Sequence, residues 1–429
     1  FKKVQKAKKP TVISCKTIIG FGSPNKSGKA SSHGSPLGKE EVALVRKKLK
    51  WHNPPFDVPK KILDEWKKIG TRGLQAEEKW KKNKSIKTLI KEDNPYNYFL
   101  KAKKKYLNEK EKEIKDREPI ATRKSSEKIL NFLVNKIPTL IGGSADLSGS
   151  NNTKTKNHQI IKPNNFKGNY IHYGVREHAM CGIMNGIALH SKLIPYGGTF
   201  LIFSDYCKPS IRLAAIMKQQ VIYVMSHDSI GLGEDGPTHQ PIEQLAGLRS
   251  IPNLNVFRPA DSSETYECWQ LAIETKESPS IIAVSRQKVN PVRKEFFKEN
   301  KCLLGAYEIS RTNSKIDLTI LATGSEVNLA IEVSQKLATE KIYSKVISMP
   351  CHELFDKQKK EYKSKILNET KYKISIEAST TDYWKKYVNE NGITFGIDKF
   401  GKSAPYKKIY QHFNLTSENI ITKVKGLLK

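Results

Sequence analysis

The chain has 429 residues, enough for two or three domains that each bury a core, and a hydrophobic share of 38% excludes a wholly disordered chain. We find no run of about 18 apolar residues, so the sequence predicts a protein that does not span a membrane. A formal net charge of +32 raises nucleic acid as a partner, but the lysines are spread along the chain and interleaved with acids, which indicates solvated helix faces and argues against one.

Residues 1–55 are predicted to be the last part of an α/β domain. The chain starts with Phe1 and a basic stretch, which is neither a secretory signal nor a normal translation start, so we expect N-terminal truncation. The β-branched run 11–19 predicts a buried strand, 20–38 a Gly/Ser/Pro loop, and 40–51 a helix. Residues 56–117, rich in charges with a few aromatics, are predicted to be a helical linker between domains.

An α/β domain with a parallel sheet is predicted over residues 118–298. Apolar runs alternate with helical patterns, and polar loops follow the predicted strand ends. We expect helices over 125–136 and after Glu177, and strands near 139–141, 193–195, 221–225 and 280–284. A smaller C-terminal α/β domain, 301–429, is predicted from strands that begin at Leu318, Ser344 and Tyr372.

The most informative polar string is His227-Asp-Ser-Ile-Gly-Leu-Gly-Glu-Asp235-Gly-Pro-Thr-His239-Gln-Pro, which follows the strand 221–225. Histidines and aspartates in a loop beyond the carboxyl end of a strand stand where α/β sheets bind ligands. The alternative is a loop of polar residues that only bond to one another.

Small residues and two arginines are further candidates. The string Gly142-Gly-Ser-Ala-Asp146-Leu-Ser-Gly-Ser150 lets backbone approach a ligand, and Ser150 could donate to a phosphate oxygen, although such a string is also an ordinary turn. Arg123 and Arg286 offer bidentate grips for phosphate, or form surface ion pairs.

One carboxylate and three aromatic rings complete the candidates. Glu177 begins an apolar helix, where it either favours the helix dipole or, if buried, serves proton transfer. Phe200, Phe203 and Tyr206 are spaced for one helical face, which is typical of core but could hold a flat cofactor ring. The chain has no G-x-x-x-x-G-K-[ST] or G-x-G-x-x-G string and no hydrolase order of Ser, His and Asp, so a cofactor could supply the nucleophile.

Taken together, these strings resemble the transketolase family. The resemblance rests on the His227–Pro241 string, on the segments around Gly142, Glu177 and Phe203, and on further matches. These further matches are Ser14-Cys-Lys-Thr-Ile-Ile-Gly20, His33-Gly-Ser-Pro-Leu-Gly, Ser285-Arg-Gln and Leu321-Ala-Thr-Gly-Ser-Glu-Val. It implies a thiamine-diphosphate enzyme that moves a two-carbon ketol unit from a ketose phosphate to an aldose phosphate in the pentose phosphate pathway.

The resemblance also implies roles for single residues. Glu177 would pair with the aminopyrimidine ring of the cofactor, Phe203 would stack on that ring with Phe200 and Tyr206 nearby, and Asp146 would lie at a subunit contact beside it. His33 would approach cofactor and substrate. Sugar hydroxyls are matched to His227 and Asp235, and the phosphate to Arg123, Ser150, His239 and Arg286. Glu177, His33 and His227 would be catalytic.

The family binds the diphosphate through Mg²⁺ with a G-D-G motif and a later Asn, and this chain has no such motif. We therefore predict no metal ligand in this chain, a site at the interface of a homodimer, and negligible activity for the chain alone. The alternatives are a dihydroxyacetone synthase or another thiamine-diphosphate enzyme, and a non-catalytic basic protein that binds nucleic acid. Six scattered cysteines without a C-x-x-C pair predict reduced thiols and a cytoplasmic location.

Overall fold

The computed structural model describes residues 1–9, 11–82, 95–116, 118–293 and 295–429. The chain divides into two compact units, Phe1–Glu92 and Asp93–Lys429, which are described separately. In the first unit the described helices are α1 (Lys39–Lys48), α2 (Lys60–Thr71) and α3 (Leu74–Lys82), with short 3-10 turns at Val4–Lys6 and Ala30–Ser32. The helix predicted over 40–51 is therefore confirmed as α1.

The buried strand predicted over residues 11–19 is wrong. This segment has no regular secondary structure, and side chains such as Val12 and Ile18 are exposed. A strand is stable only when a neighbouring strand takes up its backbone hydrogen bonds, and the described residues of the first unit contain no other strand. An apolar run is therefore not sufficient for a strand here.

Six parallel strands form the sheet that follows, which confirms the predicted parallel α/β fold. They are β1 (Leu140–Ser144), β2 (Tyr170–His172), β3 (Ile194–Phe200), β4 (Ile222–Ser226), β5 (Asn255–Phe257) and β6 (Ser280–Val284), in the order β2-β1-β3-β4-β6-β5. Every neighbouring pair is parallel. All six strands therefore end at the same edge of the sheet.

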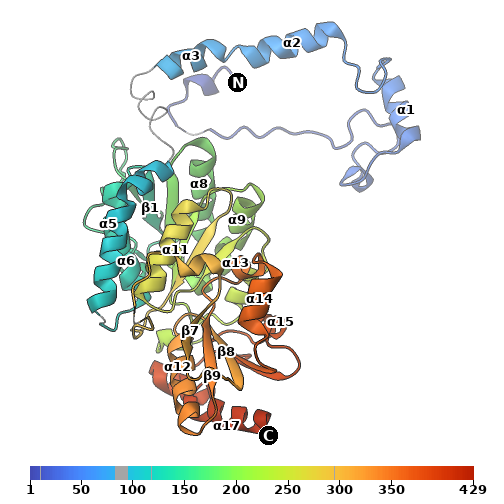
Figure 1. The fold of residues 1–429 in the computed structure, drawn as a ribbon. Coiled ribbons are helices and arrows are strands. Elements are labelled where there is room, and N and C mark those ends of the chain that lie inside the picture. Colours follow the sequence, from blue (N-terminus) through green and yellow to red (C-terminus); the bar gives the residue numbers. More distant parts are fainter. Residues whose placement is uncertain (10, 83–94, 117, 294) are drawn as a thin grey trace. The chain divides into compact units, whose positions relative to one another are not determined.

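Helices cover both faces of this sheet (Figure 1), because its central strands are apolar on both sides. Ile222 and Val224 of β4 pack into a core with α5 (Pro95–Asp116), α6 (Thr122–Lys136) and α11 (Ser262–Glu274). Tyr223 and Met225 point the other way, into a core with α8 (Glu177–His190), α9 (Ser204–Ile216) and α10 (Gln244–Arg249).

Helix α5 lies within the stretch predicted as a linker, yet it packs tightly on this domain. Phe99 and Tyr106 are fully buried in the core, and the Tyr106 hydroxyl donates to the Tyr266 carbonyl at 2.6 Å. Lys110 is also buried, 2.6 Å from Glu267 of α11. Glu267 pairs bidentately with Arg293, at 2.5 and 2.7 Å. Burial alone would raise the pKa of Glu267, but Arg293 and Lys110 lower it to about 2.

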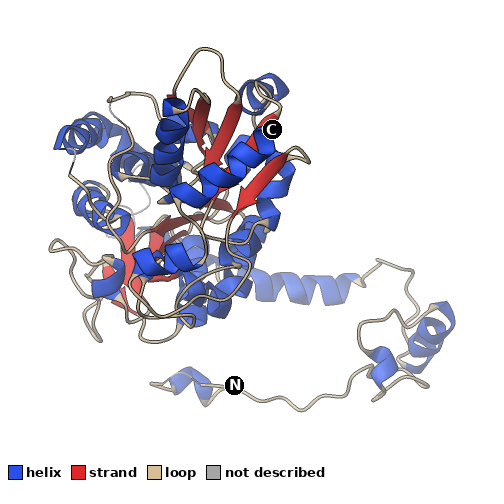
Figure 2. Cartoon of the chain, turned by 90° about the horizontal axis from the view of Figure 1, so that it is seen from below, coloured by secondary structure: helices blue, strands red, loops and turns tan. Residues whose placement is uncertain are grey.

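A second, smaller sheet forms the C-terminal domain, which carries the three strands predicted there. Its strands are β7 (Tyr307–Arg311), β8 (Leu318–Ala322), β9 (Ser344–Ser348), β10 (Tyr372–Ile376) and β11 (Gly392–Phe395), in the order β11-β10-β8-β9-β7, with β7 antiparallel at one edge. Helices α12 (Glu326–Thr339) and α17 (Ser417–Leu428) cover one face. Helices α13 (His352–Asp356), α14 (Lys360–Leu367) and α15 (Lys385–Val388) cover the other, and both sheets appear between helices in Figure 2.

Two further sequence predictions concern membrane spans and thiols. Among the described residues, none of the helices combines the length and apolar character needed to cross a bilayer. All six cysteines are free thiols, and only Cys15 is exposed.

The buried ion cluster on α11 generates the first prediction. Replacement Glu267→Gln leaves the cations of Lys110 and Arg293 buried without an opposite charge, and breaking such a pair costs about 3–5 kcal/mol of unfolding free energy. Urea unfolding followed by tryptophan fluorescence measures this. Glu274→Gln is the matched control, because Glu274 lies on the same helix and pairs with α5 through the half-exposed Lys103, which predicts a loss below about 1 kcal/mol. Equal losses for the two variants would contradict the prediction.

Candidate active site

The candidate site lies at the carboxyl edge of the six-stranded sheet. Phe200 pairs with Ser226 and Ser226 with Val284, so β3, β4 and β6 end level, and β1 ends two residues short of them because Ser144 pairs with Gly198. The chain runs from β1 to β2 on one side of it and from β2 to β3 on the other side of β1, which makes this a topological switch point, where open α/β sheets bind ligands.

Arg123 and Arg286 are brought together by a reciprocal pair of hydrogen bonds between the residues beside them. The backbone N–H of Thr122 donates to the Ser285 hydroxyl at 3.1 Å, and the N–H of Ser285 donates to the Thr122 hydroxyl at 2.7 Å. This joins the first turn of α6 to the end of β6. Two candidates separated by 163 positions thus face one site.

The two guanidinium groups form a cationic patch. Arg123 donates to the Ser150 carbonyl at 2.8 Å, and Arg286 donates to the Leu232 carbonyl at 2.9 Å. Neither forms an ion pair with a carboxylate in the part of the chain that the structure describes. Burial and then the charge of Arg286 lower the pKa of Arg123. Two unpaired like charges held close together are suited to an anionic ligand.

His227 stands next to this patch in a strained backbone conformation. Its φ is 61°, in the left-handed region that few residues other than glycine adopt. The ring is buried, stacks on Phe200 with a centroid distance of 3.7 Å, and places Nδ1 2.8 Å from the Ser226 hydroxyl. Burial, followed by the charges of Arg123 and Arg286, lowers the pKa of His227 to about 3. The imidazole is therefore neutral at neutral pH.

The three aromatic residues do not lie on one helical face, so that expectation is wrong. Phe200 still pairs with Ser226 and ends β3, Phe203 lies in a 3-10 turn, and Tyr206 belongs to α9 and is 64% exposed. Phe200 and Phe203 nevertheless stack, with centroids 5.6 Å apart and planes within 11°. His239 packs edge-on against Phe203 at 5.5 Å. The rings of Phe200, Phe203 and His239 therefore form an aromatic cluster beside the carboxyl edge of the sheet.

Glu177 is the first residue of α8 and is buried. No hydrogen bond to its carboxylate is found within the described residues, and neither carboxylate oxygen is among the fully buried atoms without a partner, so the carboxylate remains accessible. A carboxylate in this state fits a ligand with N–H groups, and Phe203, which is only half-buried, offers a flat face. The residues present thus fit an aminopyrimidine ring.

The remaining candidates are more exposed. Asp146 follows β1 with a φ of 61° and is exposed, as is Asp235 in the turn before Gly236. Ser150 is half-buried, and its carbonyl accepts from Arg123. His33 belongs to the first unit, where it is exposed directly after the Ala30–Ser32 turn, and it is described with that unit alone.

A buried ion network supports the His227 loop from behind, and sequence reasoning missed it. Arg258, which follows β5, donates to Asp228 at 2.9 Å, to Glu326 at 2.6 Å and to Glu377 at 3.2 Å. Arg249 pairs bidentately with Glu377, at 2.7 and 2.9 Å. Burial raises the pKa of Asp228, although Arg258 opposes this. Asp228 therefore anchors the loop to both domains and is not available to a ligand.

Sequence reasoning also missed Asn151 and Ser226. The Ser226 hydroxyl donates to the Asn151 side-chain oxygen at 2.7 Å, and both residues are buried below the candidate site. A hydroxyl on the last residue of β4, directly before His227, was the only signal in the sequence.

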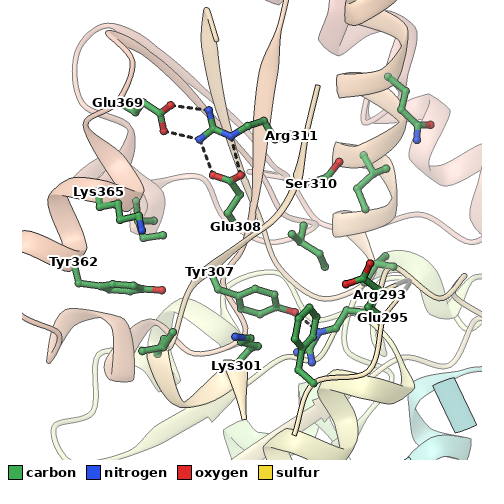
Figure 3. A pocket seen from close by; sticks show the side chains of 17 residues that line it. Arg293, Glu295, Lys301, Tyr307, Glu308, Ser310, Arg311, Tyr362, Lys365 and Glu369 are labelled. Carbon is green, nitrogen blue, oxygen red and sulfur yellow. Dashed lines mark hydrogen bonds and ion pairs between the residues drawn. The ribbon is translucent and has the colours of Figure 1, made fainter. Parts of the chain in front are cut away.

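A cavity of about 640 Å³ lies elsewhere, beside the edge strand β7 (Figure 3). Its charged residues largely neutralise one another: Arg311 pairs with Glu308 and Glu369, at 2.8 and 2.7 Å. Arg293, which also lines it, pairs with Glu267. Lys301 and Lys365 also line this cavity, and no ion pair of either is found among the described residues, but none of the predicted site residues lies here.

Three family models match the chain. They describe a "Transketolase, thiamine diphosphate binding domain" at residues 2–96, a "Transketolase, pyrimidine binding domain" at 118–291, and a "Transketolase-like TK C-terminal domain" at 305–416. The sheet with the candidate site corresponds to the second of these. The first match does not support the expected truncation, because the model of that domain covers residues 2–96.

Proteins similar to this chain are known both from sequence and from solved structures. A transketolase of Sinorhizobium medicae is 44% identical over 100% of this chain and 62% of its own length. The crystal structure of a transketolase from Campylobacter jejuni matches with a TM-score of 0.83 and 33% identity, over 99% of this chain and 64% of that one. A transketolase of Pichia stipitis in complex with sedoheptulose 7-phosphate matches with a TM-score of 0.81 and 34% identity, over 96% and 61%. The chain thus spans less than two thirds of the length of these relatives.

Proposed function

Because the chain belongs to the transketolase family, we propose that it provides the pyrimidine-ring and sugar-phosphate contacts of a transketolase site. The reaction is the reversible transfer of a two-carbon ketol unit from a ketose phosphate to an aldose phosphate. The observation that carries this proposal is the unpaired cationic patch of Arg123 and Arg286 at the carboxyl edge, beside the neutral ring of His227.

The substrate contacts follow from the chemistry of the patch. Arg123 and Arg286 bind the phosphate, together with the Ser150 hydroxyl and His239. Asp235 accepts hydrogen bonds from sugar hydroxyls, since it is exposed in its turn. His227 also faces the sugar, and its position within the field of both arginines places it close to the phosphate end. The complex of the Pichia stipitis transketolase with sedoheptulose 7-phosphate supports a sugar phosphate as the ligand class.

The cofactor is thiamine diphosphate, as the matched domain descriptions indicate. When bound, it supplies the nucleophilic carbon that carries the ketol unit. Glu177 accepts a hydrogen bond from the pyrimidine ring and holds the proton there, while Phe203 stacks on the ring beside Phe200 and Tyr206. His33 contacts cofactor and substrate, and Asp146 lies beside the cofactor. Mg²⁺ accompanies the diphosphate, and the protein acts in the cytoplasm.

The partner is a second copy of this chain, with the site at the subunit interface. Helices α8 and α9 pack on each other and carry large apolar side chains that are about half exposed, namely Ile183, Leu189, Leu213 and Ile216. Gly182 and Gly186 add a flat strip on α8, with open space around both. Exposed apolar side chains gathered on two neighbouring helices are typical of a protein interface, and Glu177 and Tyr206 belong to the same two helices.

Binding of ribose 5-phosphate tests the cationic patch. We expect Arg286→Gln and Arg123→Gln each to weaken binding roughly 10- to 100-fold, because each removes a charge-assisted hydrogen bond. Isothermal titration measures the affinity, and unphosphorylated ribose shows how much the phosphate contributes. Arg311→Gln is the matched control, because Arg311 is already paired with Glu308 and Glu369. Equal binding of ribose and ribose 5-phosphate would refute the proposed phosphate site.

Glu177→Gln tests the cofactor contact. With thiamine diphosphate and Mg²⁺, the sequence predicts negligible ketol transfer by the chain alone from xylulose 5-phosphate to ribose 5-phosphate. If the wild-type chain does transfer the ketol unit and Glu177→Gln abolishes the transfer, the prediction of negligible activity is wrong and catalysis is assigned to this chain. Turnover that survives Glu177→Gln would refute the role of Glu177. Formaldehyde as a competing acceptor distinguishes a dihydroxyacetone synthase.

Sedimentation equilibrium tests the proposed homodimer. We expect the wild-type chain to sediment as a dimer, and Ile183→Lys or Leu213→Lys to shift it towards monomer, because each variant places a charge in an apolar interface. Leu303→Lys, at a comparably exposed leucine in another part of the chain, should leave the dimer unchanged. A monomeric wild-type chain would contradict the proposal.

A further inference from the structure

Residues 233–240 form a loop, here called the ligand loop, that carries two of the residues proposed to contact the ligand. Asp235 is exposed on this loop and His239 is half-buried. The backbone N–H groups of His239 and Gln240 both donate to the Gly236 carbonyl, at 3.0 and 3.1 Å. These two bonds close one turn, but they do not fix where the loop lies relative to the sheet.

The side chain of Gln240 joins both ends of the ligand loop to the C-terminal domain. Its amide nitrogen donates to the Gly233 carbonyl at 2.8 Å and to the carbonyl of Lys402, which lies between β11 and α16 (Tyr406–His412), at 2.9 Å. Both partners are carbonyl oxygens, which only accept, so the nitrogen of the amide must face them. Gln240 is 1% exposed, so water does not compete for these two bonds.

The two neighbours of Lys402 complete this contact. Gly401 is buried, and a methyl group at this position would collide with Gln240 Oε1, so only glycine lets the amide lie where it does. The Ser403 hydroxyl donates to the Glu234 carbonyl at 2.5 Å. The C-terminal domain therefore contacts the ligand loop near its start and at its end.

We propose that Gln240 is a positioning residue, which holds Asp235 and His239 where they meet the ligand by fixing the ligand loop against Gly401 and Lys402. Gln240 itself is not a ligand contact, because it is buried and both hydrogens of its amide are already donated. The arrangement of the loop is a property of the chain, whereas the part that Asp235 and His239 play in binding rests on the proposed function.

Hydrogen–deuterium exchange of the ligand-free chain, followed by mass spectrometry, tests the loop. Gln240→Met keeps the length of the side chain but removes both donated hydrogens. We expect peptides from residues 233–240 to exchange about tenfold faster, because the amide hydrogens of the loop are then protected only by the turn itself. Exchange at the wild-type rate in Gln240→Met would overturn the proposal.

Gln220→Met is the matched control. The Gln220 amide nitrogen also donates to two carbonyl oxygens, those of Ala272 and Ile273, at 3.1 and 2.8 Å. Gln220 lies just before β4, however, at the opposite edge of the sheet from the candidate site. This variant should leave exchange in residues 233–240 unchanged, and an equal rise in the two variants would count against a specific role for Gln240.

Gly401→Ala tests the same contact from the C-terminal domain. The added methyl group displaces the Gln240 amide, so exchange in residues 233–240 should rise as it does in Gln240→Met. In the Gln240→Ala background, Gly401→Ala should add less than about twofold, because the nearest remaining side-chain atom is Cβ of residue 240, 3.2 Å away. Fully additive effects would show that the two residues act separately, which contradicts the proposal.

Binding of ribose 5-phosphate separates positioning from a general structural role. We expect Gln240→Met to weaken binding about fivefold and Gln220→Met to leave it unchanged. In a chain that already carries Asp235→Ala and His239→Ala, Gln240→Met should have no further effect, because the residues that it positions are gone. A weakening that persists in that background would refute the positioning role.

The contact of the loop and the enzymatic function can fail independently. If Gln240→Met speeds exchange but the wild-type chain does not bind ribose 5-phosphate, the hold of Gln240 on the loop stands and the sugar-phosphate site falls. If the wild-type chain binds ribose 5-phosphate and Gln240→Met binds it equally well, the proposed function stands and this inference falls.

Discussion

The arrangement of the site depends on one buried cation. Arg258 is fully buried and contacts three carboxylates, one on the His227 loop and two on the C-terminal domain. A buried guanidinium charge is costly unless carboxylates neutralise it, so the two domains must meet around it. Asp228 is thereby held in place, and the strained backbone of its neighbour His227 is maintained. The C-terminal domain thus shapes a site to which it contributes none of the residues proposed to bind the ligand.

The parallel sheet brings residues that are distant in the sequence together on one surface. Four neighbouring strands end within two residues of one another, and each delivers a different group: small residues after β1, an aromatic ring at β3, a histidine after β4 and a guanidinium after β6. The order of the strands leaves room at the switch point between β1 and β3. Burial, followed by the charges of the two arginines, lowers the pKa of His227 and keeps the ring neutral, so the cationic patch and the neutral ring are parts of one electrostatic arrangement.

The sequence pattern predicted the strands that are apolar and central in their sheets. It missed the strands and residue roles that depend on tertiary contacts. Strand β6 was found with its full bounds and β10 with its first residue, since all or nearly all of their residues are buried. The short β5 and the polar edge strand β7 carry no such pattern. Asp228 and Asp235 stand in the same string and look alike, yet one binds a buried arginine and the other is exposed. Only tertiary contacts distinguish them.

The contacts of α5 and Arg258 also bear on the order in which the protein can fold during synthesis. Lys110 can form its ion pair only after Glu267, which is 157 positions later, has been synthesised. Arg258 likewise can pair with Glu377, which is 119 positions later, only after that residue has been synthesised. Until those partners leave the ribosome, the cations stay in water and the helices that carry them cannot dock fully. Folding around the carboxyl edge is therefore completed late, when most of the C-terminal domain has been made.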